Sequence, residues 1–479
     1  MMYARSVQLT EPLTDIEKKV LEQVKPKPSE YELMRRVFEK IQETILSVLE
    51  AKGVEAEITL QGSIAHDTWL SGERDMDVFV LFPKSWSTEE LKTKGFKILL
   101  EAAEKLGSYM IRYAEHPYVR VVIDNVEADL VPAFKLDDPS EIRTAVDRTP
   151  FHTRYIKENL REELKDHVRL LKKFLKSIGV YGAEIKTRGF SGYLCELLII
   201  AYDGFIDLLK KARYWRPPVK VSTIREEALL DNIFRELVKR YPDSYMYVPD
   251  PVDPRRNVAA AVSLKSIITM KIASYCYTFN PRIEYFFPPR DQGLKEDKIR
   301  DMIRRRCILL VILPVKEALA PDILWGEIQR IADRASKLLR NFDFTPIDWS
   351  VWTDEREVAV IALEIDECSK PYPRLYYGPS HHSLKRVHSF IKSHVMRGSF
   401  GPWINEHGEL MALSNRKYSD AKKLLIERAN EYIVTPHFKG LQPHVEALDE
   451  YVDKLKEDMM NWIVSFVKKR PYWMDYCID

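Results

Sequence analysis

The sequence predicts a multidomain α+β protein, and three observations lead to this prediction. With 479 residues, the chain is too long for one ordinary hydrophobic core, so roughly two to four domains are expected. Before about residue 135, alternating apolar segments lie between amphipathic ones, which is the pattern of a mixed sheet flanked by helices. Helical spacing then dominates from about 151 to 270, and a second region of helices and strands follows.

The first region is predicted element by element. Thr14–Glu17 and Ser29–Glu32 match the S/T-x-x-E capping box, so two helices are expected to begin there. A short strand is expected over 55–61, and Ser87 is expected to cap a helix that runs to Gly107.

Strands are then expected over 109–116, 119–124 and 127–134. Asp124–Asn125 lies between alternating apolar segments, so the second and third of these strands are predicted to form a hairpin. Further along, a sheet is expected over 308–314 and 347–366, followed by a long C-terminal amphipathic helix. The proline-containing cluster FFPPRD at 286–291 is predicted to separate this last region from what precedes it.

Composition excludes few functions. Apolar residues make up 45% of the chain and charged residues 30%, as in a soluble globular protein. The 74 Lys and Arg against 72 Asp and Glu give a formal net charge of +2, which neither requires nor excludes nucleic acid. The most apolar window, 194–209, contains Glu196 and Asp203 and is too short to span a bilayer, so we expect a buried helix there and no membrane partner.

The cysteines are scattered and contain no C-x-x-C pair, so neither a disulfide framework nor a structural zinc site is expected. This pattern is typical of a cytoplasmic protein in a reducing compartment, and the first residues have no signal-peptide core. The cysteines are Cys195, Cys276, Cys307, Cys368 and Cys477.

The segment DMDVFVLF, which begins at Asp75, carries the clearest sign of chemistry. Asp75 and Asp77 are two residues apart in a strand, so both carboxylates project from one face. Two unpaired carboxylates repel each other, and a Mg²⁺ ion, which prefers oxygen ligands, removes that cost. The alternative is that both acids lie at an exposed strand end.

Two further features favour the metal site. Gly62 and Ser63 precede a short apolar stretch, and a helix starting there would direct free N–H groups toward an anion such as a phosphate. Asp129 lies in the middle of a later strand, where an acid needs a partner. That partner is either the same metal or a nearby basic residue.

The motif G-S-x(n)-D-x-D with a later strand Asp resembles the nucleotidyltransferase superfamily of the DNA polymerase β type. More narrowly, the chain resembles the archaeal-type, class I CCA-adding enzymes (tRNA nucleotidyltransferases). The resemblance covers most of the chain and is strongest over roughly 57–265. It is carried by GSIAHDTWLSGERDMDVFVLFP, AEHPYVRVVIDNVEADLVPAF, AVDRTPFHTRYI, VRLLKKFLKSIGVYGAEIKTRGFSGYLCELLI and DPVDPRRNVAAAVS.

The resemblance implies template-independent addition of C, C and A to the 3′ end of tRNA from CTP and ATP. It implies a polymerase-β-like catalytic head at 1–150, a helical central domain at 151–270, and an α/β body and tail at 271–479 that binds tRNA. Asp75, Asp77 and Asp129 would hold two Mg²⁺ ions, with Asp129 assisting deprotonation of the RNA 3′-hydroxyl. The resemblance also suggests a homodimer.

The implied nucleotide-binding residues come from the matched motifs. Lys172 belongs to a basic run that by itself would indicate a solvated helix face, and His152 could simply pack; inside the matched motifs the binding role is favoured. The implied set is Gly62, Ser63, His66, Thr149, His152, Lys172, Tyr181 and Arg256.

Residues 66 and 67 depart from the family pattern, which has Arg-Gly where this chain has His66-Asp67. A histidine is only partly charged near neutral pH, and Asp67 would add negative charge near the phosphates unless it caps the short helix. We therefore expect weaker nucleotide binding than in typical members, and a lower KM for ATP when both residues are restored to Arg-Gly.

Candidate RNA contacts are basic segments, some with adjacent aromatic residues that could stack on bases. Two alternatives to CCA addition stay open: another template-independent polymerase of the poly(A) type, and an RNA-binding protein that has lost catalysis. The candidate segments are 165–176, Lys186, Arg188, 210–216, Arg304–Arg306 and Lys468–Arg470.

Overall fold

The computed structural model describes residues 11–113, 117–224, 226–289, 296–397 and 400–478. The chain divides into two compact units: unit 1 comprises residues 1–289 and 471–479, and unit 2 comprises residues 290–470. This division falls within the predicted 286–291 boundary, of which 290–291 lie outside the described residues. The domain limits predicted at 150 and 270 lie inside unit 1 and in helix α11 (Leu264–Phe279), and stay predictions.

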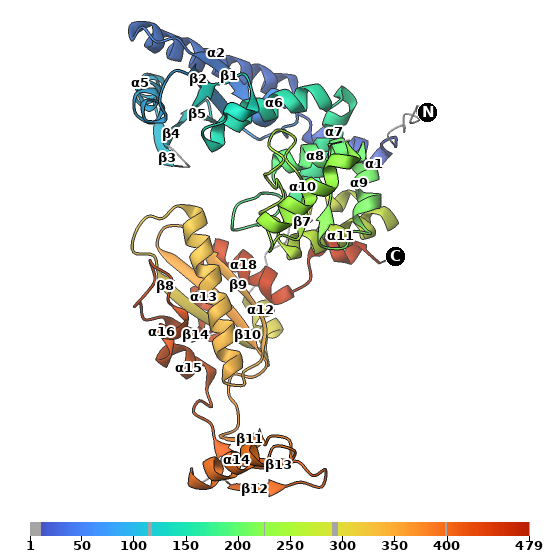
Figure 1. The fold of residues 1–479 in the computed structure, drawn as a ribbon, viewed down its shortest axis with the longest axis vertical. Coiled ribbons are helices and arrows are strands. Elements are labelled where there is room, and N and C mark those ends of the chain that lie inside the picture. The colour runs from blue at the N-terminus through green and yellow to red at the C-terminus, as the bar shows by residue number, and fades with distance from the viewer. Residues whose placement is uncertain (1–10, 114–116, 225, 290–295, 398–399, 479) are drawn as a thin grey trace. The chain divides into compact units, whose positions relative to one another are not determined.

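Unit 1 begins with a five-stranded sheet of order β1-β2-β5-β4-β3 (Figure 1). β2 and β5 run parallel and the other neighbours run antiparallel, so the predicted mixed sheet is confirmed. The strand predicted at 109–116 is confirmed over Tyr109–Tyr113, and 114–116 lie outside the described residues. The strands are β1 (Glu57–Gln61), β2 (Asp75–Pro83), β3 (Tyr109–Tyr113), β4 (Pro117–Ile123) and β5 (Val126–Lys135).

Two helices cover one face of this sheet, α2 (Pro28–Ala51) and α5 (Phe96–Leu106). Val78, Val80 and Phe82 of β2 are fully buried beneath them, whereas the opposite face carries the acids. The predicted hairpin is confirmed: Asp124 and Asn125 have φ of +50° and +60°, as a type I′ turn requires.

Of the two helix caps predicted near the start of the chain, one is confirmed and the other is wrong. Thr14 caps α1 (Asp15–Val24) in a complete capping box, as expected. Ser29 does not cap α2: the helix already begins at Pro28, and Glu30 accepts a hydrogen bond from the backbone N–H of Lys27. Proline suits the first turn of a helix, so the start moves one residue upstream of the predicted cap.

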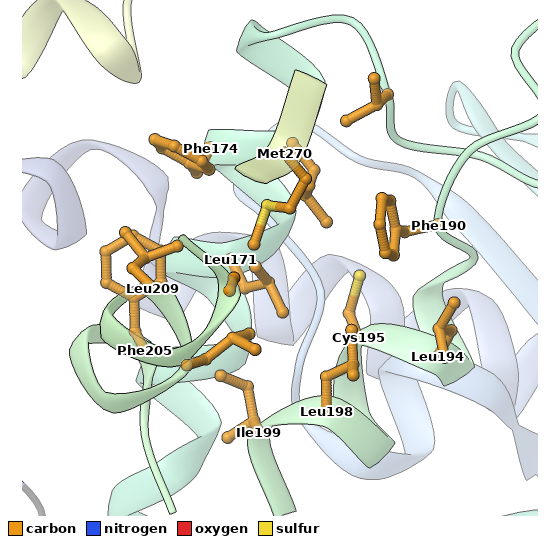
Figure 2. Packing of buried hydrophobic residues seen from close by; sticks show 14 of the residues in the cluster. Leu171, Phe174, Phe190, Leu194, Cys195, Leu198, Ile199, Phe205, Leu209 and Met270 are labelled. Carbon is orange, nitrogen blue, oxygen red and sulfur yellow. The ribbon is translucent and has the colours of Figure 1, made fainter. Parts of the chain in front are cut away.

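Ser87 caps the predicted helix, which contains α4 (Thr88–Glu90), a π-helical segment (Leu91–Gly95) and α5. The remaining part of unit 1 is helical around one large core, part of which is shown in Figure 2. Its elements are α6 (Arg148–Asn159), α7 (Lys165–Ser177), α8 (Gly192–Tyr202), α9 (Phe205–Ala212), α10 (Glu227–Arg240), α11, and the short strands β6 (Val219–Lys220) and β7 (Met246–Tyr247).

The apolar window 194–209 is buried as predicted, but it forms two helices rather than one. Asp203 adopts a left-handed conformation with φ of +58° and ends α8, and α9 begins two residues later. In the described parts of the chain, no helix combines the length and the hydropathy needed to cross a bilayer.

Unit 2 holds a four-stranded antiparallel sheet of order β14-β8-β10-β9 and a separate three-stranded sheet of order β11-β13-β12. The first confirms the strands predicted at 308–314 and 347–366. Its strands are β8 (Cys307–Pro314), β9 (Pro346–Thr353), β10 (Val358–Ile365) and β14 (His444–Ala447); the second sheet contains β11 (Pro373–Tyr377), β12 (Phe400–Ile404) and β13 (Leu410–Asn415).

The four-stranded sheet has an apolar core on each face, and α13 packs on one of them while α12 and α18 pack on the other. The predicted long C-terminal helix is α18, which is only 12 residues long. The helices of unit 2 are α12 (Glu296–Ile303), α13 (Pro321–Asn341), α14 (Leu384–Met396), α15 (Ala421–Glu427), α16 (Ala429–Tyr432), α17 (Leu448–Tyr451) and α18 (Glu457–Lys468).

The expectation of no disulfides is wrong. Cys276 bonds Cys477 within unit 1, and Cys307 bonds Cys368 within unit 2. The partners are 201 and 61 residues apart, so no local spacing reveals them; folding alone brings them together. Crosslinks of such separation contribute roughly 2–4 kcal/mol by restricting the unfolded chain. Cys195 is a buried free thiol.

Candidate active site

The three predicted acids lie side by side on one face of the five-stranded sheet. In the strand register, Gln61 of β1 is opposite Asp77 of β2, and Asp77 is opposite Asp129 of β5. Asp75 is opposite Glu127, one step along the same pair of strands. Directly opposite residues project from the same face. The fold therefore gathers four carboxylates, those of Asp75, Asp77, Glu127 and Asp129, which we call the acid row.

The acid row carries uncompensated negative charge. Desolvation by the surrounding protein, together with the charges of Asp129 and Asp75, raises the pKa of Asp77 to about 6, although Asp77 remains accessible to solvent. Desolvation and the charge of Glu127 also raise the pKa of Asp75. Within the described ranges, neither residue forms an ion pair. This excess of negative charge strongly favours the binding of a cation.

Asp129 does have a basic partner, which is one of the two alternatives that its position predicted. Arg120 of β4 lies opposite Asp129 in the hairpin register and binds both carboxylate oxygens, with Nε 2.6 Å from Oδ1 and Nη2 2.8 Å from Oδ2. Its third nitrogen, Nη1, donates to Oε2 of Glu127 at 2.7 Å. Sequence reasoning missed Arg120, although the turn at 124–125 already places it opposite Asp129.

The donor set suits a divalent metal. Carboxylate oxygens are the ligands that Mg²⁺ prefers, and the charge repulsion in the acid row is relieved when a cation binds. The side-chain amide oxygen Oε1 of Gln61, whose residue lies opposite Asp77 in the register, is buried and has no hydrogen-bond partner in the described structure. As the side chains lie, no three described His, Cys, Asp or Glu residues are arranged to hold a metal, since Asp129 faces Arg120.

Gly62 is required next to the acid row for two reasons. Its φ is +67°, a conformation that side chains disfavour, and a Cβ there would lie 2.5 Å from Oδ2 of Asp77. Gly62 and Ser63 are the first residues of the short helix α3 (Gly62–His66), so their backbone lies against the acids. The sequence predicted a close backbone approach to a ligand, and the structure shows close approach to a carboxylate.

His66 does not lie open to a ligand. Its ring is 6% exposed, with Nδ1 2.9 Å from Oε1 of Glu196 in α8 and Nε2 3.1 Å from Oγ1 of Thr153 in α6. Burial by itself would raise the pKa of Glu196, but His66, Lys172 and Thr68 outweigh this and hold it below its usual range. The ring therefore joins the catalytic sheet to the central helices.

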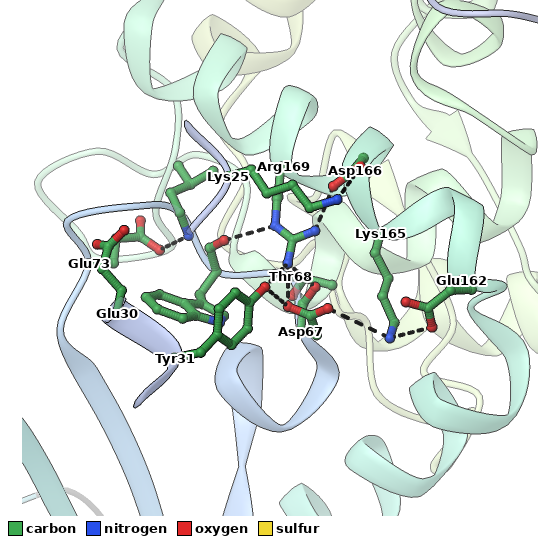
Figure 3. Close-up of polar contacts among 12 residues, drawn as sticks. Lys25, Glu30, Tyr31, Asp67, Thr68, Glu73, Glu162, Lys165, Asp166 and Arg169 are labelled. Carbon is green, nitrogen blue, oxygen red and sulfur yellow. Dashed lines mark hydrogen bonds and ion pairs between the residues drawn. The ribbon is translucent and has the colours of Figure 1, made fainter. Parts of the chain in front are cut away.

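Asp67 ends α3 in a left-handed conformation, and its carboxylate is neutralised (Figure 3). It accepts hydrogen bonds from Arg169 and from the hydroxyl of Tyr31 at 2.6 Å, and Lys165 lies 3.9 Å away. The expectation that Asp67 adds uncompensated negative charge is therefore not supported. The cap on α3 that the sequence offered as an alternative is what the structure shows.

Lys172 and Tyr181 meet at the start of α8. Lys172 is 1% exposed and donates to the backbone oxygen of Thr68 at 3.0 Å. A Cβ on Gly192 would lie 3.1 Å from the Tyr181 hydroxyl and 3.8 Å from Nζ of Lys172. Burial raises the pKa of Tyr181, so its hydroxyl remains a donor. A side chain at residue 192 would crowd both groups, so glycine there lets Tyr181 and Lys172 lie close to the backbone of α8.

His152 and Arg256 converge on Asp250, which is fully buried. Nε2 of His152 lies 2.8 Å and Nη1 of Arg256 2.9 Å from Oδ2 of Asp250. The ring of Tyr193 stacks on His152 with centroids 4.2 Å apart. Burial by itself would raise the pKa of Asp250, but the contact with His152 lowers it. Thr149 lies in the first turn of the same helix as His152.

Sequence reasoning missed Asp250 and Tyr193. Asp250 begins the matched segment DPVDPRRNVAAAVS, but nothing local indicates which side chains it meets. Several predicted RNA contacts are internal: Arg169 and Lys172 are buried, and Lys176 pairs with Glu73. Tyr214 stays 67% exposed, with the guanidinium of Arg213 4.8 Å from its ring centroid.

Three family models match successive parts of the chain. They are a nucleotidyltransferase domain at 41–152, the second domain of tRNA nucleotidyltransferase at 166–287, and the C-terminal domain of the CCA-adding enzyme at 305–440. Together with the acid row on a mixed sheet, they define the class: the protein is a nucleotidyltransferase.

Relatives of nearly full length narrow the class. The CCA-adding enzyme of Sulfurisphaera tokodaii is 38% identical, covering 96% of this chain and 99% of the relative. The CCA-adding enzyme of Sulfolobus acidocaldarius is 37% identical, with the same coverage of both chains. A solved cytoplasmic RNA terminal U-transferase aligns at 17% identity with a TM-score of 0.43, over 57% of this chain and 97% of that chain. The chain belongs to the CCA-adding enzyme family.

Proposed function

We propose that this protein adds C, C and A to the 3′ end of tRNA from CTP and ATP, without a nucleic-acid template. The observation that carries the proposal is relatedness over almost the whole length of named CCA-adding enzymes, including the C-terminal region. The acid row supplies the catalytic group that this chemistry needs. The 3′-hydroxyl oxygen attacks the α-phosphorus of the nucleotide, and pyrophosphate leaves as the bond to the β-phosphate breaks.

Asp75, Asp77 and Asp129 would hold Mg²⁺, which when bound favours ionisation of the 3′-hydroxyl and offsets the charge of the triphosphate. Asp77 brings its carboxylate against the backbone of Gly62, which fixes the distance between the acids and the start of α3. Asp129 is the acid proposed to assist removal of the hydroxyl proton. The acids thereby order the two reacting groups, an effect that contributes much of the rate in phosphoryl transfer.

The nucleotide would bind between the sheet and the central helices. Ser63, Thr149, Lys172 and Tyr181 are proposed to contact its phosphates, an assignment that rests on the family motifs to which they belong. Arg256, held by the buried Asp250, is proposed to contact the base edge. His66 is proposed to act indirectly, by fixing α3 against α6 and α8.

One assay tests the reaction. The protein is incubated with tRNA that lacks its 3′ CCA, with Mg²⁺ and with labelled CTP and ATP, and the products are sequenced at their 3′ ends. Addition that stops after CCA supports the proposal. A long homopolymer supports a poly(A)-type polymerase instead, and tRNA binding without addition supports a protein that has lost catalysis.

A cytoplasmic location and a homodimer belong to this proposal as well. The proposed tRNA substrate argues for the cytoplasm, although disulfides are rare in cytosolic proteins outside hyperthermophiles. Sedimentation equilibrium of the purified protein tests the homodimer: a mass near twice 56.1 kDa is expected, and a mass near 56.1 kDa contradicts it.

A further inference from the structure

Arg120 is a charged residue that contacts the acid row and has no part in the proposed chemistry. Its guanidinium binds Asp129 through Nε and Nη2 and binds Glu127 through Nη1. The side chains of Arg120 and Asp129 are 26% and 17% exposed, so the pair is largely shielded from water. A two-point contact of this kind fixes the orientation of a carboxylate more firmly than a single hydrogen bond does.

This contact opposes metal binding. Both oxygens of Asp129 accept from Arg120, so the carboxylate cannot turn fully toward Asp77 while the contact lasts. A guanidinium and a divalent cation on one carboxylate also repel each other, and the repulsion is strong where water is partly excluded. A metal ion that uses Asp129 therefore has to compete with Arg120.

Glu127 is a second carboxylate partner for the guanidinium of Arg120. It already accepts from Nη1 at 2.7 Å, its side chain is 47% exposed, and it lies two residues before Asp129 on β5. If Asp129 turns away, the guanidinium keeps a carboxylate partner, and its charge is not left isolated. The exchange requires movement of side chains and no change in the strand register.

The geometry points to Arg120 as a positioning residue that holds Asp129 away from the metal site until metal binds, and that then remains on Glu127. This inference rests on the proposed metal site and adds a regulator of metal affinity to it. Arg120 is thus an internal cation that stabilises the acid row when the metal is absent.

Direct binding of Mn²⁺, followed by the electron paramagnetic resonance signal of the free ion, tests the inference. We expect Arg120→Gln to bind Mn²⁺ about tenfold more tightly than the wild-type protein, the scale on which partners of metal ligands act. Arg120→Lys keeps the charge but cannot grip both oxygens, so it should also bind several-fold more tightly. Arg112→Gln, on the neighbouring strand β3, is the control for loss of a nearby charge and should bind as the wild type does.

A double-mutant cycle separates displacement from simple charge effects. Glu127→Gln removes the carboxylate that Arg120 would keep after it releases Asp129. The change should therefore weaken Mn²⁺ binding about fivefold when Arg120 is present and much less in the Arg120→Gln background. Strictly additive effects would overturn the inference. So would Arg120→Lys binding like the wild type, or Arg120→Gln binding no more tightly.

A metal-free measurement adds an independent readout. In the presence of a chelator, Arg120→Gln should unfold at a lower temperature than the wild type, because the acid row has lost its cation. Adding Mn²⁺ should raise the unfolding midpoint more in the variant than in the wild type. An unchanged midpoint in chelator contradicts the inference. Asp77→Asn distinguishes its failure from that of the metal site: if wild-type Mn²⁺ binding survives this change, the metal assignment itself is wrong.

Discussion

Both sheets that have a large core carry acids within their strands, and these acids have opposite surroundings. In unit 2, Glu364 of β10 is bound by two cations: Nε and Nη2 of Arg306 lie 2.7 and 2.9 Å from its oxygens, and Nζ of Lys469 lies 2.9 Å away. In unit 1, the guanidinium of Arg120 binds Asp129 and Glu127 of the acid row, and Asp75 and Asp77 form no ion pair within the described residues.

The difference shows that an acid within a strand does not by itself indicate a catalytic site. Burial would raise the pKa of Glu364, but Arg306 and Lys469 outweigh it and lower the value, so this carboxylate serves the fold. The pKa of Asp77 is raised instead, because desolvation is reinforced by the charges of Asp129 and Asp75. Burial acts in the same direction on both acids, so the balance of nearby charge is what separates structure from function.

The largest expected effect comes from removing an acid of the row. Asp77→Asn should lower CCA addition at least about a thousandfold, because a proposed metal ligand is lost, while the protein stays folded. Incorporation of labelled CTP into tRNA lacking CCA measures the loss. Asp137→Asn, which removes an exposed acid paired with Lys84, is the control and should keep full activity. Wild-type rates in Asp77→Asn would place catalysis elsewhere.

The matching change in unit 2 should act on stability. Glu364→Gln leaves Arg306 without its carboxylate and leaves Lys469 with Asp348 as its remaining partner, and because both cations are partly exposed we expect a loss of about 2 kcal/mol in the free energy of unfolding. Chemical denaturation measures it, and tRNA end labelling should show an unchanged rate at low temperature. A neutral effect would mean that the three groups are better solvated than their contacts indicate.

When a chelator keeps the protein metal-free, the contributions of Asp77 and Glu364 to folding stability should depend on pH in opposite directions. Asp77 has a folded pKa of about 6 against an ordinary 3.8, so the folded state holds its proton more tightly, and the associated stability is lost as pH rises through 6. Glu364 has a lowered pKa, so its stabilisation is present above its ordinary 4.5 and is lost as pH falls.

Midpoints of thermal unfolding between pH 4 and 7 test these signs. The advantage of the wild type over Asp77→Asn should fall with rising pH by roughly 2–4 °C, while its advantage over Glu364→Gln should grow. If the unfolding midpoints of the wild type and Asp77→Asn change equally with pH, the acid row does not carry excess negative charge.

The smallest effect is expected at Asp67. Asp67→Asn keeps the left-handed cap and weakens one of several contacts of Arg169, so we expect a loss of about 0.5 kcal/mol and less than about a twofold change in KM for ATP. Steady-state kinetics checks this. A large fall in KM would restore the idea that Asp67 repels the triphosphate.

Local features of the fold were predictable because neighbouring residues determine them. The Asp124–Asn125 turn, the shared face of Asp75 and Asp77, and the cap at Thr14 depend on backbone preferences within a few residues. Arg120 was within reach of the same reasoning: pairing Ile123 with Val126 sets Arg120 opposite Asp129.

Other features depend on tertiary contacts and lay beyond local patterns. The interior positions of His66 and Lys172 follow from packing of the sheet against the central helices, and a polar residue gives no sign that such a partner exists. The same holds for Asp250 and for Cys276 with Cys477, which meet across 201 residues.

The return of residues 471–478 to unit 1 has a consequence for the order of synthesis. Trp473, 1% exposed, completes the core that α7, α8 and α11 build, and Cys477 closes the crosslink to Cys276. All of unit 2 is translated between those partners. Unit 1 therefore cannot finish folding while its own first 289 residues are being made, and waits until the ribosome has passed through the whole of unit 2.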